Sequence, residues 1–218
     1  MPRKKNVSES RIISFYMDYV VAHKAKPVSI EKFAEINNFD EAQFYEHFYS
    51  FKALEKAIYK ILFENSVAIL TQSKEFVSFS NKDKLLSLYY TFFENLTLNR
   101  AYIAVALEGY QNQLKALSVF SELKKSFTEF VDSLELDTIN LPIDGVENIQ
   151  KKAIHEAAWI QLLITLKFWL DDNSEDFQKT DIFIEKSLNT SFDLLDTKSL
   201  SNLIDLGKFL YKEKFQSS

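Results

Sequence analysis

Glycine and proline are scarce in this chain, which contains three of each among its 218 residues. Tight turns and β-hairpins depend on them, because glycine adopts positive φ without strain and proline fixes φ. We therefore expect long helices joined by polar loops. The chain also lacks cysteine, so disulfides and thiolate chemistry are excluded. Its 46% hydrophobic and 26% charged residues are typical of a folded globular protein.

Apolar side chains recur at the spacing of amphipathic helices along most of the chain. The helix over residues 146–170 is apolar on nearly every face, so we expect it to be buried on several sides. A loop is predicted over residues 137–145. The sequence thus predicts an all-α protein of nine or ten helices. They cover residues 10–25, 29–38, 41–47, 51–70, 85–96, 101–113, 117–134, 146–170, 183–195 and 199–215.

Polar residues mark the starts of three consecutive helices near the N-terminus. Ser29 and Ser50 are natural N-cap residues, and Asp40 with Gln43 three positions later predicts a capping box. Between the second and third helices, Asn38 is expected at positive φ, because asparagine tolerates the left-handed conformation. This pattern predicts two short helices joined by a tight turn, with a longer helix after them.

The stretch from Ser29 to Leu54 resembles the helix-turn-helix of the TetR (tetracycline repressor) family of transcriptional regulators. The spacing of the family pattern is kept throughout. The matching positions are Phe33-Ala34, Asn38-Phe39-Asp40, Tyr45-x-His47-Phe48, and Ser50 with Leu54.

This resemblance implies a TetR-like fold with two parts. A three-helix helix-turn-helix domain would occupy residues 1–50, and a helical ligand-binding and dimerisation domain residues 51–218, with the helix over 51–70 connecting them. The implied function is that of a one-component regulator whose DNA binding is modulated by a small apolar ligand. The helices over 146–170 and 183–195 carry more apolar surface than one small bundle can hide. We therefore predict a homodimer.

The resemblance also indicates which residues could contact DNA. The basic N-terminal arm could reach phosphates or a minor groove, Gln43 could read an adenine, and Tyr45 could contact a phosphate. His47 belongs to the same helix, although packing of the helix-turn-helix domain explains it better. The candidate DNA-binding residues are Arg3, Lys4, Lys5, Gln43, Tyr45 and His47.

Three departures from the family pattern count against DNA binding. Asp40 and Glu41 are anionic at the start of the recognition helix, and the family's phosphate-binding lysine of the next helix is Phe51. Between Ser29 and Ala57 there are six acidic residues and only three lysines. DNA affinity depends largely on Lys and Arg that neutralise phosphates. A second function therefore stays open, that of a TetR-like accessory protein that binds a lipid or isoprenoid and no DNA.

Aromatic residues on the C-terminal helices are the candidates for contact with a ligand. By resemblance, these helices would surround the family's ligand cavity, and His155 could orient a polar group of the ligand. The alternative is that the rings simply form the core, as most aromatic stripes at helical spacing do. The candidate ligand-binding residues are Tyr89, Phe93, Tyr102, Tyr110, His155, Trp159 and Trp169.

The sequence indicates no enzyme, cofactor or metal site. His155-Glu156 begins like a zinc-protease helix, but Trp159 stands where the second histidine belongs. The paired acidic residues lie in polar breaks and are interpreted as caps and loops.

The chain contains no run of about 20 apolar residues, which is the length that a membrane-spanning helix needs. We therefore predict a cytoplasmic protein without integral membrane association. On the last predicted helix, a cluster of basic and aromatic residues could meet a membrane surface, or could simply place favourable charge at a helix C-terminus. These residues are Lys208, Phe209, Lys212, Lys214 and Phe215.

Overall fold

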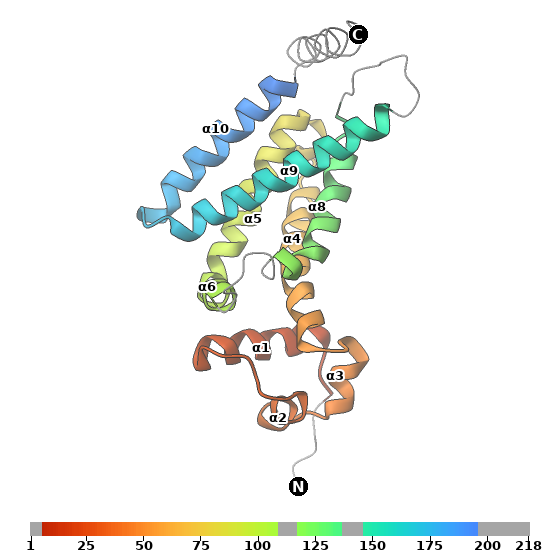
Figure 1. Cartoon of the computed structure of the whole chain (residues 1–218), viewed down its shortest axis with the longest axis vertical. Coiled ribbons are helices and arrows are strands. Elements are labelled where there is room, and N and C mark those ends of the chain that lie inside the picture. The colour runs from red at the N-terminus through yellow and green to blue at the C-terminus, as the bar shows by residue number, and fades with distance from the viewer. Residues whose placement is uncertain (1–5, 109–116, 137–145, 196–218) are drawn as a thin grey trace, which may run out of the picture. The chain divides into compact units, whose positions relative to one another are not determined.

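The computed structural model describes residues 6–108, 117–136 and 146–195. All regular secondary structure in these ranges is helical, which confirms the predicted all-α fold. None of the described helices is long and apolar enough to cross a membrane. The helices are α1 (Glu9–His23), α2 (Ile30–Ile36), α3 (Glu41–His47), α4 (Phe51–Thr71), α5 (Asn81–Leu98), α6 (Arg100–Glu108), α8 (Ser121–Ser133), α9 (Val146–Asp171) and α10 (Gln178–Leu195), with 3₁₀ turns at Phe76–Ser78 and Glu175–Phe177 (Figure 1).

Several predicted features lie outside the described residues. They are the basic arm with Arg3, Lys4 and Lys5, the candidate ligand residue Tyr110, the loop 137–145, and the last helix with its basic and aromatic cluster.

Serine caps start the N-terminal helices where the sequence predicts them. The Ser29 hydroxyl accepts the backbone N–H of Lys32 at 3.2 Å, and the Ser50 hydroxyl accepts that of Ala53 at 3.2 Å. Each bond satisfies one of the amide groups that a helix N-terminus leaves without an intrahelical partner. As a result α2 and α4 begin directly after these two serines, at Ile30 and Phe51. Helix α3 has the predicted bounds, and α4 ends one residue later than predicted.

The start of α10 differs from the prediction, which placed it at residue 183. The helix begins at Gln178 because the buried Asp172 carboxylate organises the preceding turn. Asp172 accepts the backbone N–H groups of Ser174 at 2.8 Å and of Thr180 at 2.9 Å. The first turn of α10 is held by these polar contacts and carries no apolar periodicity, so the sequence pattern missed it.

Two compact units make up the chain. The first comprises residues 1–72 and 91–127, and the second comprises residues 73–90 and 128–218. Helices α5 and α8 therefore contribute to both. The predicted domain boundary after residue 50 stays a prediction.

In the first unit, an aromatic core holds the N-terminal helices together. The head (residues 6–58) contains α1, α2, α3 and the start of α4 (Figure 1). Its central residue is the fully buried Phe33, whose ring lies 5.7 Å from that of Phe39 and 6.3 Å from that of Phe44. Edge-to-face contacts of this kind add to the stability that burial alone gives.

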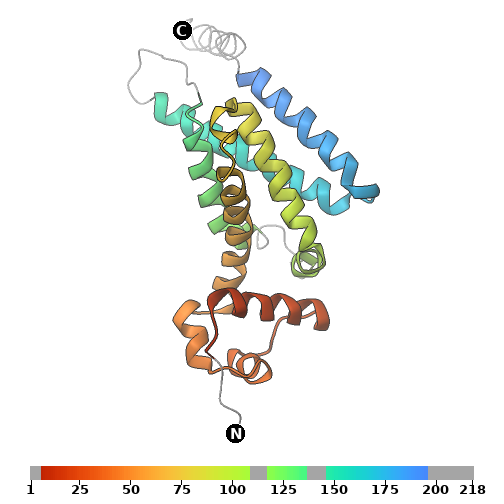
Figure 2. The same ribbon diagram turned by 180° about the vertical axis from the view of Figure 1, so that it is seen from behind.

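In the second unit, α9 and α10 run side by side in opposite directions, as both views show (Figures 1 and 2). The rings of Phe168 and Phe183 stack at 4.6 Å between the two helices. Trp169 is fully buried. This α9–α10 pair is the part of the second unit from which a candidate ligand cavity is built.

Candidate helix-turn-helix and ligand cavity

The turn after α2 has the geometry of a Schellman motif. Asn38 has φ of 57°, which confirms its expected positive φ. Its backbone N–H donates to the carbonyl of Glu35 at 3.1 Å, and that of Phe39 donates to the carbonyl of Ala34 at 3.1 Å. Phe39 is buried, so it anchors the turn in the head core. Because α3 begins two residues later, the arrangement is that of a helix-turn-helix.

The predicted capping box is present at the start of α3. The Gln43 side-chain oxygen accepts the backbone N–H of Asp40 at 3.3 Å. The side-chain nitrogen of Gln43 donates to the Asn6 side-chain oxygen at 2.9 Å. Both ends of the Gln43 carboxamide are therefore engaged within the chain. A role in reading adenine would have to use the second N–H and the second oxygen lone pair of this carboxamide.

Tyr45 and His47, the other described candidates for DNA contact, lie exposed on α3. The Tyr45 hydroxyl donates to the Glu41 carboxylate at 3.3 Å. Partial desolvation and the negative charge of Glu41 raise the pKa of Tyr45 above its ordinary value. The phenol of Tyr45 therefore stays neutral around pH 7.

A hollow of about 630 Å³ lies where α2 meets α3. The described residues of its walls include four carboxylates and no basic side chain, and these residues repel phosphate. The four acidic residues are Glu31, Glu35, Asp40 and Glu41.

Phe51, which replaces the family's lysine at the start of α4, serves the core of the head. Its ring centroid lies 5.3 Å from that of Tyr16, 5.6 Å from that of Phe33 and 5.4 Å from that of Phe44. The chain therefore uses this position for aromatic packing.

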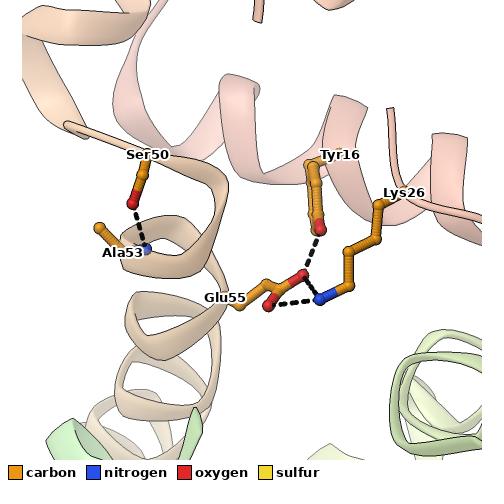
Figure 3. A network of polar contacts seen from close by, with 5 residues as sticks. All are labelled: Tyr16, Lys26, Ser50, Ala53 and Glu55. Carbon is orange, nitrogen blue, oxygen red and sulfur yellow. Dashed lines mark hydrogen bonds and ion pairs between the residues drawn. The ribbon is translucent and has the colours of Figure 1, made fainter. Parts of the chain in front are cut away.

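A buried polar network that no sequence pattern predicted joins α1 to α4 (Figure 3). Glu55 of α4 is only 4% exposed. Its carboxylate accepts a hydrogen bond from the Tyr16 hydroxyl and pairs with the Lys26 ammonium, whose nitrogen lies 2.7 and 2.9 Å from the two carboxylate oxygens. A useful signal was that Glu55 falls on the apolar face of the predicted helix over 51–70, beside Leu54 and Ile58.

Beside this network lies a small cavity of about 250 Å³ within the first unit. Tyr102 of α6, a candidate ligand residue, lines it and is itself buried. The rings of Tyr16 and Tyr102 meet edge to face at 6.4 Å, where α1 packs on α6. The cavity thus connects the head network to α6.

The remaining described ligand candidates lie in both units. Phe93 is buried in the first unit, and Tyr89, Trp159 and Trp169 are buried in the second. Burial raises the pKa of Tyr89 well above its ordinary value. Contact of these rings with a ligand stays a prediction.

His155 joins two helices of the second unit. Its Nε2 atom lies 2.7 Å from a carboxylate oxygen of Asp132 on α8. Among the described residues, no group of three His, Asp or Glu side chains could hold a metal ion.

A larger cavity, of about 460 Å³, lies in the second unit. It is bounded by the α9–α10 pair, with Leu85 of α5 and Val131 of α8 completing the wall. Its lining is almost entirely apolar and, among the described residues, includes no charged side chain. The lining residues are Leu85, Val131, Leu136, Ile154, Ala157, Ala158, Ile160, Gln161, Ile164, Phe183, Ser187, Ser191, Phe192 and Leu195.

Three large apolar side chains on one face of α9 are exposed. Ile160, Ile164 and Phe168, which we call the α9 stripe, are 53%, 52% and 37% exposed. Ile182 of α10, 51% exposed, lines a surface groove together with Phe168. A contiguous apolar surface of this kind is typical of a protein interface.

A family model described as "Tetracyclin repressor-like, C-terminal domain" matches residues 84–210. The match covers more than half of the 218 residues. The match includes the α9–α10 pair. The head precedes the matched residues, so its assignment as a helix-turn-helix depends on its geometry. Comparison of the chain with curated proteins and with solved structures gives no match.

Proposed function

This chain belongs to the tetracyclin repressor-like family, and we propose that it is a cytoplasmic, homodimeric one-component transcriptional regulator. The observation that carries this proposal is the helix-turn-helix of the head. Its turn, its capping box and its aromatic core hold α2 and α3 in one arrangement. The same arrangement leaves Tyr45, Glu46 and His47 of α3 exposed to solvent.

Dimerisation is the second part of the proposal. Proteins of this family typically form homodimers and bind small ligands. The α9 stripe supports this assignment, because a second copy related by a two-fold axis would remove the same three side chains from water on both subunits. A dimer would also double every contact between the heads and DNA.

Ligand control is the third part. A ligand that binds one of two dimer arrangements more tightly shifts the population toward that arrangement, and thereby changes how well two heads fit one operator. The cavity of about 460 Å³ between α9 and α10 supports a ligand of small-molecule size.

Fluorescence anisotropy with the DNA upstream of the chain's own gene tests the regulator. We expect binding at low salt that weakens as salt rises, because each neutralised phosphate releases counterions. A second DNA fragment of the same length and unrelated sequence is the control for specificity. If neither fragment binds at low salt, the regulator hypothesis is wrong.

A second candidate function is that of an accessory protein that binds a lipid or isoprenoid and no DNA. The acidic surface of the head favours it, because the hollow beside α3 carries four carboxylates. The triple change Asp40→Ser, Glu41→Arg and Glu46→Arg separates charge from geometry. If charge alone is the obstacle, non-specific DNA affinity should rise about tenfold or more, and its salt dependence should steepen. An unchanged affinity would show that the geometry for DNA binding is itself lost.

A further inference from the structure

The walls of the 460 Å³ cavity are largely apolar, so they favour an apolar molecule over water. Leu85, Val131, Ile154 and Phe183 come from four different helices, and their side chains face the same hollow. Water inside such a site would find few hydrogen-bond partners, so replacing it with an apolar molecule is favourable. The volume falls within the range of small-molecule sites in proteins.

None of the described residues that line this cavity is charged. A carboxylate or an ammonium group in contact with these walls would lose part of its hydration and would meet no counter-ion among the described lining residues. The cavity therefore discriminates against ionised ligands such as fatty acids and cationic drugs. Neutral molecules have no such cost.

A line of polar side chains crosses the apolar wall. The Gln161 side-chain nitrogen donates to the Ser187 hydroxyl at 3.3 Å, and the Ser191 hydroxyl donates to the Gln161 side-chain oxygen at 2.8 Å. These bonds hold the Gln161 carboxamide in a fixed orientation between α9 and α10. A carboxamide has two N–H donors and an oxygen with two lone pairs, so two of its four bonding positions remain for a ligand.

We propose that this cavity binds a neutral, largely apolar molecule that carries one hydroxyl or carbonyl group, and that Gln161 recognises this group. This inference rests on the proposed function, because it names the ligand class of the regulator. Gln161 selects among neutral ligands, while the uncharged walls exclude ionised ones.

A matched pair of fluorescent probes tests the exclusion of charge. N-phenyl-1-naphthylamine is neutral, and 1-anilinonaphthalene-8-sulfonate has the same rings with an added sulfonate. We expect the full-length protein to bind the neutral probe at least tenfold more tightly. Absence of binding of the neutral probe, or equal affinities, would overturn the proposal. Neither measurement involves DNA, so failure of the regulator hypothesis leaves the result unaffected.

Displacement of the neutral probe then tests the role of Gln161. Naphthalene, 1-naphthol and 1-naphthoate share one ring system. At position 1 they carry a hydrogen, a hydroxyl and a carboxylate, respectively. We expect 1-naphthol to displace the probe about fivefold better than naphthalene, which is the effect of one net hydrogen bond, and 1-naphthoate to be the weakest. Equal displacement by all three would overturn the proposal.

Variants locate the site. Gln161→Leu should remove the advantage of 1-naphthol over naphthalene and leave naphthalene unchanged, whereas the control Gln178→Leu, at the exposed start of α10, should keep that advantage. Ala158→Phe should fill the cavity and weaken binding of the neutral probe about tenfold. If this variant folds and binds the probe as well as the parent, the cavity is not the site. If Ala158→Phe fails to fold, the proposal is still decided by Gln161→Leu, through the ratio of its affinities for 1-naphthol and naphthalene.

Discussion

The head and the α9–α10 pair differ in how far their large apolar side chains are exposed to solvent. In the head, the rings of Tyr16, Phe33 and Phe44 are fully buried against one another. On α9, the three side chains of the α9 stripe lie 37–53% exposed on one helical face. The head also exposes Val28, Ile36 and Tyr49, but these come from different elements.

The difference indicates where each region needs a partner. The apolar rings of the head are buried within the head itself. Its surface can therefore carry charge, and this charge influences which macromolecule binds there. The α9–α10 pair is left with an exposed α9 stripe, and two of its residues, Ile160 and Ile164, also line the apolar cavity. A second copy and a small molecule would therefore both reduce its contact with water. Four predictions test this contrast.

The largest expected effect is in the head core. Phe33→Ala removes the ring that contacts those of Phe39, Phe44 and Phe51, and should lower the free energy of unfolding by about 3 to 5 kcal/mol. Urea unfolding followed by circular dichroism measures this change. The control Ile36→Ala lies on the same helix but is 64% exposed, and should cost less than about 0.5 kcal/mol. Similar losses for the two variants would contradict the central position of Phe33.

The next effect concerns association. Ile164→Asp places a charge in the middle of the α9 stripe and should weaken the dimer about 100-fold, or about 2.7 kcal/mol, because the carboxylate would be buried without a counter-ion. Analytical ultracentrifugation over a dilution series measures the dissociation constant. Ile69→Asp is the matched control, because Ile69 of α4 is similarly exposed, at 58%, and lies outside the stripe. A dimer that survives Ile164→Asp as well as Ile69→Asp would assign the interface elsewhere.

The buried network of the head comes third. Glu55→Gln keeps the shape of the side chain but removes the charge that pairs with Lys26, and should cost about 2 kcal/mol. This value is moderate because the Lys26 side chain is 48% exposed and can return to water. Glu64→Gln on the same helix is the control, because its pair with Lys60 at 3.6 Å is solvated and should contribute less than about 0.5 kcal/mol. Equal values from urea unfolding would show that Glu55 gains nothing from burial of the pair.

Local features of the head could be predicted from sequence, because their partners are neighbours in the chain. The cap at Ser50, the positive φ of Asn38 and the capping box of Asp40 with Gln43 each involve residues within a few positions. Helix periodicity likewise predicted the all-helical fold. The stretch from Ser29 to Leu54 resembles the family pattern, and the match of the C-terminal residues then showed that family.

The buried network and the cavity could not be predicted in this way. Glu55 lies 39 positions from Tyr16 and 29 from Lys26, and only the packing of α1 on α4 brings them together. The same applies to Gln161 and Ser187, whose contact depends on how α9 meets α10. A single sequence gives no signal for such pairs, except that a charged or polar residue falls on an apolar helix face.

The smallest predicted effect concerns the turn that joins α9 to α10. Burial alone would raise the pKa of the Asp172 carboxyl, but hydrogen bonds from Ser174 and Thr180 outweigh it and hold this pKa well below its ordinary value. A carboxyl whose pKa is lower in the folded state stabilises the fold above its unfolded pKa, about 3.9, and loses that contribution as pH falls toward the folded pKa. Asp172→Asn should therefore lower the melting temperature at pH 7, and its difference from the parent should shrink by pH 3. Asp171→Asn, at an exposed neighbour paired with Lys167, should show little change at either pH. If the Asp172→Asn difference is as large at pH 3 as at pH 7, the turn depends on the two acceptor oxygens of the side chain and not on its charge.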